Sequence, residues 1–89
     1  MLKFKPSPVN TKLELHSDSR IYCKAEGRVP PKVRWAKIGE RGFPAHVVDL
    51  EGTLNFAGVT KEDEGRYMCI AQSEQGLINA TIGVEVVGE

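Results

Sequence analysis

The stretch from Asp63 to Cys69 constrains the fold of this chain more than any other part of the sequence. Tyr67 stands two residues before Cys69, and an acidic turn precedes both. Residues two apart on a β-strand point to the same face, so both side chains enter one core. In a β-sandwich this pattern marks the strand that follows a corner, where the tyrosine hydroxyl bonds back to the corner backbone. The stretch therefore predicts an all-β sandwich with a strand that begins near Arg66.

Cys23 and Cys69 are the only cysteines, and the single tryptophan, Trp35, lies between them in the sequence. This order predicts a buried tryptophan that packs against a bridge between two sheets. A bridge that closes a loop of this length would contribute roughly 4 kcal/mol in the chain-entropy model. An oxidised pair indicates a secreted or cell-surface protein. The alternative is that both thiols are buried and reduced, as a cytosolic sandwich could keep them.

Length and charge narrow the possible classes of protein. The 89 residues form one domain, residues 1–89, because they leave no room for a second core. Twelve basic residues balance twelve acidic ones, whereas a nucleic-acid-binding domain usually has a basic excess. There is no apolar run of about 20 residues for a membrane span, nor the apolar segment of a signal peptide. A disulfide-bearing module without an export signal is expected to be a piece of a larger, multi-domain protein.

Alternating apolar residues predict the strands. Between Arg20 and Ala25, for example, Ile21 and Cys23 share one face while Tyr22 lies on the other. Turns are expected at residues 17–19, 39–42 and 73–76, and Thr60 to Asp63 has the form of a capping box. The expected strands are residues 2–5, 12–15, 20–25, 33–36, 45–49, 53–56, 66–72 and 77–87.

Several motifs together resemble an I-set immunoglobulin domain over nearly the whole chain. They are Gly52-Thr53-Leu54-x-Phe56, Val59-Thr60, Asp63-x-Gly65-x-Tyr67-x-Cys69 and the Cys23/Trp35 pair. The resemblance implies an immunoglobulin-like β-sandwich of two antiparallel sheets joined by the Cys23–Cys69 disulfide. Its core signature is Trp35, Leu54, Asp63, Gly65 and Tyr67. The interval from Trp35 to Leu54 is too short for the extra strand pair of a variable-type domain.

Further motifs resemble a membrane-proximal domain of the Off-track family of receptor pseudokinases, also called protein tyrosine kinase seven-like. These motifs are Leu2-Lys3-Phe4-x-Pro6-x-Pro8, Pro44-x-x-Val47-x-Asp49 and Cys69-Ile70-Ala71. Such receptors carry a row of these domains outside the cell, one membrane span, and a kinase-like domain inside that is thought not to phosphorylate. They act in cell adhesion and in Wnt and planar-polarity signalling.

The resemblance implies a non-enzymatic recognition or spacer module at the cell surface, in a membrane-anchored parent protein. Its expected partners are proteins: neighbouring immunoglobulin domains, a co-receptor or another copy of itself. No cofactor, small-molecule substrate or nucleic acid is expected. Similar domains occur in intracellular muscle proteins, where the thiols would be reduced, and in extracellular matrix proteoglycans. These are the alternative settings.

Asn79-Ala80-Thr81 is an N-glycosylation sequon, and strand alternation predicts that Asn79 points outward. Met68 and Ile70 alternate with core residues, so they are predicted to form a small exposed apolar patch with Ala36. The alternative is scattered surface apolars or a contact to a neighbouring domain. Phe43 and His46 form a second candidate contact group. For Phe43 the alternative is packing on its own core.

The corner carboxylate Asp63 departs from the family pattern. Many such domains pair it with an arginine at the start of the fourth strand, but this chain has Ala45-His46-Val47-Val48 there. Asp63 is therefore expected to accept backbone hydrogen bonds or to meet Lys61, Arg41 or His46. His16 and His46 have no cysteine or carboxylate at metal-ligand spacing, so no zinc site is expected.

Overall fold

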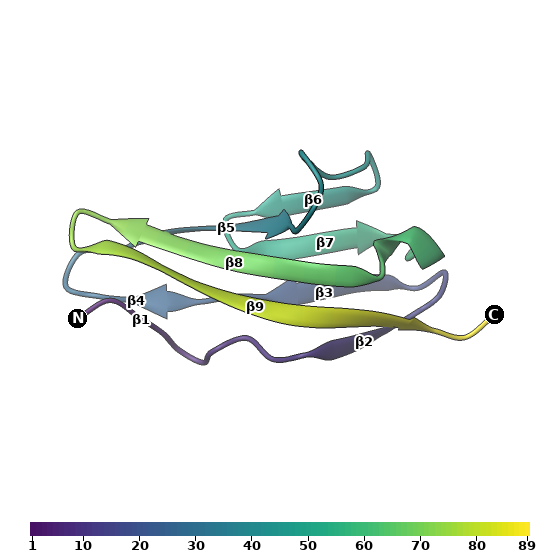
Figure 1. The fold of residues 1–89 in the computed structure, drawn as a ribbon, viewed down its shortest axis with the longest axis horizontal. Helices are drawn as coiled ribbons and strands as arrows, with labels where there is room; N and C mark the ends of the chain where they lie inside the picture. The colour runs from purple at the N-terminus through teal and green to yellow at the C-terminus, as the bar shows by residue number, and fades with distance from the viewer.

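The domain is a sandwich of two sheets in the computed structural model, which describes residues 1–89 (Figure 1). One sheet has the strand order β2-β9-β8-β5 and the other β3-β7-β6, while β1 and β4 form a separate short ladder. The elements are β1 (Lys3–Phe4), β2 (Thr11–Glu14), β3 (Asp18–Tyr22), β4 (Ala25–Glu26), β5 (Lys32–Lys37), β6 (Val47–Leu50), β7 (Thr53–Ala57), the 3-10 turn η1 (Lys61–Asp63), β8 (Gly65–Ser73) and β9 (Gly76–Val87).

The strand set confirms the predicted sandwich, with one exception to its antiparallel pairing. β2 runs parallel to β9, and Thr11 to Glu14 pair with Val84 to Val87. The chain can do this because β1 pairs with β4, and the prolines that follow β1 carry the chain across to the other sheet. β6 pairs with β7 and is the only strand between β5 and β7. The extra strand pair of a variable-type domain is therefore absent.

Alternation along the strands builds the core. Tyr67, Cys69 and Ala71 of β8 point inward and are buried, as are Leu54 and Phe56 of β7. The buried cluster also takes in residues from β2, β3, β5, β6 and β9, so each long strand contributes to a single core. This is the core that the sequence pattern predicts.

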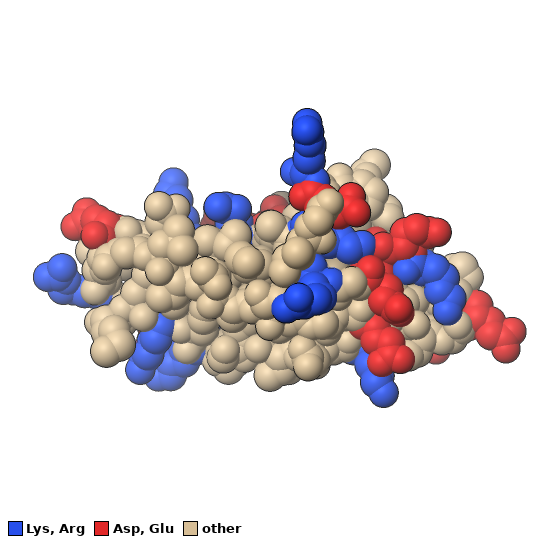
Figure 2. All heavy atoms as spheres, in the orientation of Figure 1, with Lys and Arg blue, Asp and Glu red and all other residues tan.

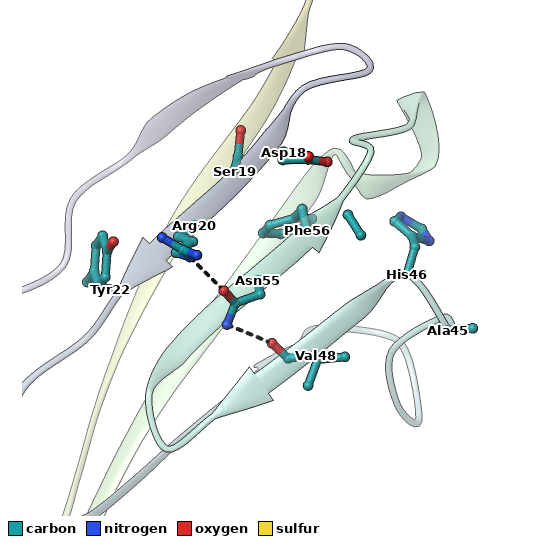
Figure 3. Close-up of a pocket in the computed structure, with 10 residues that line it drawn as sticks. Asp18, Ser19, Arg20, Tyr22, Ala45, His46, Val48, Asn55 and Phe56 are labelled. Carbon is teal, nitrogen blue, oxygen red and sulfur yellow. Dashed lines mark hydrogen bonds between the residues drawn. The ribbon is translucent and has the colours of Figure 1, made fainter.

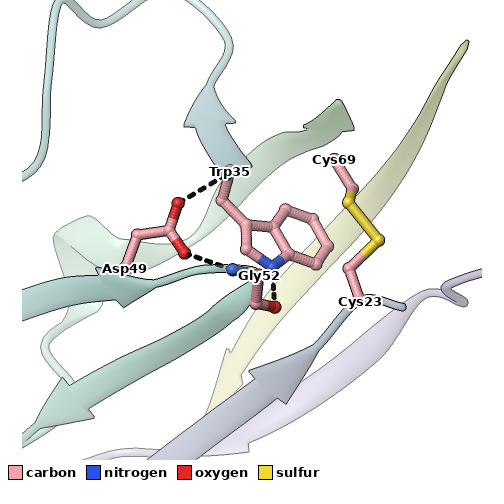
Figure 4. The surroundings of a disulfide bond; sticks show 5 residues. All are labelled: Cys23, Trp35, Asp49, Gly52 and Cys69. Carbon is pink, nitrogen blue, oxygen red and sulfur yellow. Dashed lines mark hydrogen bonds between the residues drawn. A yellow bond between two sulfur atoms is a disulfide. The ribbon is translucent and has the colours of Figure 1, made fainter. Parts of the chain in front are cut away.

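Trp35 packs beside the bridge between Cys23 and Cys69, as Figure 4 shows. Its indole Nε1 donates to the Gly52 carbonyl at 2.8 Å, and its backbone N–H donates to Asp49 Oδ2 at 2.7 Å. The second oxygen, Asp49 Oδ1, accepts from the Gly52 N–H at 3.0 Å. Since β5 and β6 are edge strands of opposite sheets, one carboxylate satisfies a donor on the open edge of β5 and fixes the β6–β7 turn.

Gly52 is required at this turn for two reasons. Its φ of +97° lies in the left-handed region that glycine adopts without steric cost. A Cβ atom there would also lie 2.7 Å from the Cys23 carbonyl oxygen and 2.8 Å from Val33 Cγ1. The Gly52 carbonyl accepts from the Cys23 N–H at 2.9 Å as well as from the indole. The turn therefore links Cys23, directly after β3, to Trp35 of β5 through hydrogen bonds to one carbonyl, beside the disulfide.

Several turn and strand boundaries differ from the sequence prediction; the expected strand at residues 45–49, for example, is observed as β6 at Val47–Leu50. The first turn lies at Leu15 and His16, not at residues 17–19, because β3 already begins at Asp18. The expected strand at residues 20–25 is divided into β3 and β4, since the Cys23 N–H bonds to the β6–β7 turn instead of a ladder partner. The turn after β5 lies at residues 38–39, ahead of the expected 39–42.

The termini lie at opposite ends of the long axis of the molecule, which measures 44 × 22 × 21 Å (Figure 1). Both outer sheet faces run along this axis and are not covered by any other part of the chain. These two faces and the corner around η1 are the surfaces on which a functional site can be built.

Candidate functional site

The corner before β8 is closed by Tyr67 and Asp63. The buried Tyr67 hydroxyl donates to the Asp63 carbonyl, as predicted. The Asp63 carboxylate, only 2% exposed, accepts from the Thr60 N–H at 2.8 Å. It also lies 2.8 and 3.0 Å from His46 Nε2 through its two oxygens. His46 therefore takes the place of the missing arginine, one of the options that the sequence left open.

Aromatic packing fixes the Tyr67 ring. Phe43 stacks on it at 6.4 Å between centroids, and Phe56 meets it edge-on at 6.2 Å. The Lys37 ammonium lies 5.6 Å from the ring centroid. Burial, with smaller contributions from the charges of Asp63 and Glu40, raises the pKa of the Tyr67 phenol above its usual value of 10.0. The hydroxyl therefore remains a hydrogen-bond donor at every physiological pH.

The predicted contact group of Phe43 and His46 is thus engaged inside the domain. Phe43 is half-buried against the core, and His46 is half-buried against Asp63. The packing alternative for Phe43 is what the structure shows. Neither side chain is free to serve as an isolated anchor for another protein, although both lie at the rim of the corner.

The predicted patch of Ala36, Met68 and Ile70 does lie on the outer face of the β2-β9-β8-β5 sheet, but it is not exposed as expected. Ile70 is only 8% exposed, and Ala36 and Met68 are half-buried. The reason is the register: Ile70 sits on the central strand between Arg34 of β5 and Asn79 of β9. Alternation assigns a side chain to a face, but neighbouring strands decide its depth.

Asn79 is exposed on that same outer face, as predicted, and Thr81 is exposed two residues further along β9. Residues 67–73 and 76–84 contain no charged side chain. Figure 2 correspondingly shows a broad uncharged area over the middle of β8 and β9. On this face Ile70 is therefore flanked by the uncharged polar Asn79 on the β9 side and by the exposed Arg34 on the β5 side.

The opposite sheet carries the more exposed apolar surface, which the sequence analysis did not single out. We call it the β3-β7-β6 outer face, defined by Tyr22, Arg20, Val48, Leu50 and the smaller residues between them. Tyr22 is 64% exposed, Leu50 62% and Val48 48%. The alternation that places Tyr22 opposite Ile21, and Val48 and Leu50 opposite Val47, is the signal that would have found it.

This face has a regular construction, of which Figure 3 shows the part around Arg20, Asn55 and Val48. Tyr22, Thr53 and Leu50 form one cross-strand row, and Arg20, Asn55 and Val48 form the next. Arg20 Nε donates to Asn55 Oδ1 at 2.8 Å, and Asn55 Nδ2 donates to the Thr53 carbonyl at 3.0 Å. A pocket opens along this face and is lined by Arg20 and Tyr22 of β3, Asn55 and Ala57 of β7, and His46 and Val48 on the β6 side.

No group of three or more His, Cys, Asp or Glu side chains is placed to hold a metal ion. The structure contains no helix with the length and apolar character needed to cross a bilayer.

The chain is similar to known proteins in both sequence and structure. A family model described as "Immunoglobulin domain" matches residues 3–73. "Tyrosine-protein kinase-like otk" of Drosophila melanogaster is 45% identical over 89 residues, which cover 97% of this chain and 9% of that protein. The Drosophila mojavensis protein of the same name is 44% identical over 87 residues, covering 97% and 8%. The chain thus spans less than a tenth of the length of these curated relatives.

Solved structures agree with these matches. "Drosophila OTK, extracellular domains 3-5" superposes with a TM-score of 0.90 at 44% identity, covering 98% of this chain and 30% of that one. The titin M3 domain superposes with a TM-score of 0.83 at 18% identity, covering 98% and 97%. The titin likeness shows the fold alone, whereas the OTK match extends to sequence.

Proposed function

Because the chain belongs to the immunoglobulin domain family, we propose that it is an extracellular recognition module of an Off-track-type cell-surface receptor and acts by protein–protein contact. The single observation that carries this proposal is the match, over nearly the whole chain, to extracellular domains of Drosophila OTK. The Cys23–Cys69 bridge supports it, since structural disulfides persist in oxidising compartments. The proposed chemistry is surface complementarity, with apolar and polar contacts made by a rigid sandwich.

The parent protein is proposed to carry further immunoglobulin domains and a membrane anchor, and to serve adhesion and Wnt or planar-polarity signalling. The opposite placement of the termini suits a row of domains joined end to end. In such a row the neighbours attach at the two ends, and both long sheet faces remain open to other molecules.

The contact surface is proposed to be the β3-β7-β6 outer face. It combines a tyrosine and an arginine, residue types enriched at interfaces, with two exposed aliphatic side chains. Arg20 is held by Asn55, so less side-chain freedom is lost on binding. The partner that fits such a face is another protein surface with an apolar centre.

A display screen tests this proposal. The secreted, oxidised domain is tetramerised and applied to cells that each display one extracellular protein, the parent receptor of this chain included. We expect specific binding to at least one displayed protein, and loss of that binding in Leu50→Glu. Leu77→Glu is the matched control, since Leu77 is similarly exposed, at 52%, but lies on β9 of the other sheet.

Binding that survives Leu50→Glu and fails in Leu77→Glu would move the contact to the other sheet. An absence of binding to every displayed protein would overturn the recognition function and leave a passive spacer between binding domains. Binding to the parent receptor itself would identify the contact as homophilic.

A further inference from the structure

We propose that Asn79 is N-glycosylated, and that its glycan covers the outer face of the β2-β9-β8-β5 sheet and blocks an open edge of β9. The inference rests on the proposed function in one respect, because N-glycosylation requires export. It adds a modification site and assigns the two sheet faces different roles, one shielded by sugar and one left for protein contact.

Asn79 is accessible to glycosylation in the folded domain. Asn10 and Asn55, the other two asparagines, are held in hydrogen bonds, from the Gly83 N–H and from Arg20 respectively. Neither of those two has a serine or threonine two positions later, as the sequon requires, whereas Thr81 stands two positions after Asn79. Both Asn79 and Thr81 are exposed, and Ala80 between them points inward and is half-buried. A glycan can therefore be carried in the folded state without disturbing the core.

The surroundings of Asn79 on the sheet can accommodate a glycan. Asn79 stands directly opposite Ile70, and Thr81 stands opposite Met68, in the β8–β9 ladder. Directly opposed side chains on one face are about 4.5–5.5 Å apart at Cβ, so the first sugars would extend over Ile70 and Met68. The neighbouring parts of β8 and β9, residues 67–73 and 76–84, carry no charged side chain that must remain hydrated. The apolar side chains of this face would then be covered by carbohydrate instead of protein.

Part of β9 has an unpaired edge close to Asn79. β9 runs from Gly76 to Val87, but β2 pairs with it only from Val84 onward. The Gly83 N–H is satisfied by the Asn10 side chain at 2.8 Å. Residues 77–82 pair with β8 on one side and have no strand on the other. Such an edge invites pairing with a second chain, and bulky or charged groups are the usual protection against it. This segment has no charged residue, so a glycan at Asn79 would supply the protection.

Mass spectrometry of the domain secreted from insect cells tests the site. We expect that treatment with peptide N-glycosidase removes the mass of one glycan and converts Asn79 to aspartate. Asn79→Gln and Thr81→Ala should each lack the glycan. Thr81→Ser, which keeps the hydroxyl that the sequon needs, should retain it and is the matched control.

The outcomes separate this inference from the function on which it rests. An oxidised, secreted domain with unmodified Asn79 would overturn the glycosylation site and leave the proposed function standing. Retention in the cell with free thiols would overturn both.

The effect on the edge is measured by sedimentation velocity. We expect Asn79→Gln to self-associate at concentrations at which the glycosylated domain is monomeric, and the added substitution Leu77→Lys to restore the monomer. If Asn79→Gln remains monomeric to the same concentration as the glycosylated domain, the edge-blocking role is wrong.

Discussion

Replacing Tyr67 by phenylalanine removes one hydrogen bond from the corner while leaving the ring in place. The ring keeps its stacking on Phe43 and its edge contact with Phe56. What is lost is the donor to the Asp63 carbonyl, in a site where Tyr67 is 1% exposed. A buried acceptor left without its partner costs about 1–3 kcal/mol, so we expect Tyr67→Phe to lower the free energy of unfolding by about that amount.

Urea unfolding followed by tryptophan fluorescence measures this change, with Trp35 as the probe. The midpoint should fall while the slope of the transition stays constant, because the surface exposed on unfolding is unchanged. Tyr22→Phe is the matched control, since Tyr22 is largely exposed and its hydroxyl is free to bond to water. Its effect should stay within about 0.5 kcal/mol. A loss in Tyr67→Phe no larger than in Tyr22→Phe would refute the argument that this bond holds the corner.

The raised pKa of Tyr67 predicts that the free energy of unfolding falls at alkaline pH. Burial raises the pKa of Tyr67 in the folded state above the usual value of 10.0, so above that pH the unfolded chain releases a proton that the folded chain retains. Stability from this group is complete below pH 10 and is lost as pH rises towards the folded pKa. The stability difference between wild type and Tyr67→Phe should therefore shrink above pH 10, as urea titrations at several pH values would measure. A constant difference would contradict it.

Three other parts of the framework can be tested by the same urea assay. His46→Ala removes the hydrogen bond between the imidazole and the buried Asp63 carboxylate and should lower the free energy of unfolding by about 1.5–3 kcal/mol; His46→Arg should be far milder, and equal losses would contradict the pairing. Removing the bridge by Cys23→Ala with Cys69→Ala should cost about 2–5 kcal/mol, and the loss should equal that caused by a reductant. Gly52→Ala adds a close contact to backbone strain, so its loss of stability should exceed that of Gly58→Ala. Gly58 has a similar φ, but no atom lies within 4 Å of a Cβ placed there. Equal losses of stability would rule out the contact.

Sequence reasoning predicted the framework because its signals are local and periodic. Tyr67, Cys69 and Trp35 lie at fixed places in a sandwich, and period-two alternation assigns their faces without knowledge of the neighbouring strands. The corner bond from Tyr67 and the burial of Trp35 follow from those places alone. The structure confirms both.

The burial of individual side chains and the contacts between distant parts of the chain could not be predicted in the same way. Ile70 was assigned to the correct face but to the wrong exposure, because its burial depends on Arg34 and Asn79 of the flanking strands. His46 was one of several candidates for Asp63, and only the path of the chain after β5 brings the two within 2.8 Å. The parallel pairing of β2 with β9 likewise depends on where the chain crosses between sheets.

The β3-β7-β6 outer face was missed for a different reason. Each of its exposed apolar residues is unremarkable alone, since scattered surface apolars are normal. Only the register places Tyr22, Leu50 and Val48 in two adjacent rows of one sheet. A surface of this kind is a property of strand pairing, and the order of residues in one strand does not reveal it.

The redox state of the secreted domain tests the central claim most directly. The domain is expressed with a secretion signal in eukaryotic cells, alkylated under native and denaturing conditions without reductant, and weighed by intact mass spectrometry. An extracellular receptor module predicts no alkylation at Cys23 or Cys69 in either condition, and two added alkyl groups only after reduction. A stably folded domain that accepts two alkyl groups on denaturation without reductant would contradict the account and indicate an intracellular structural module.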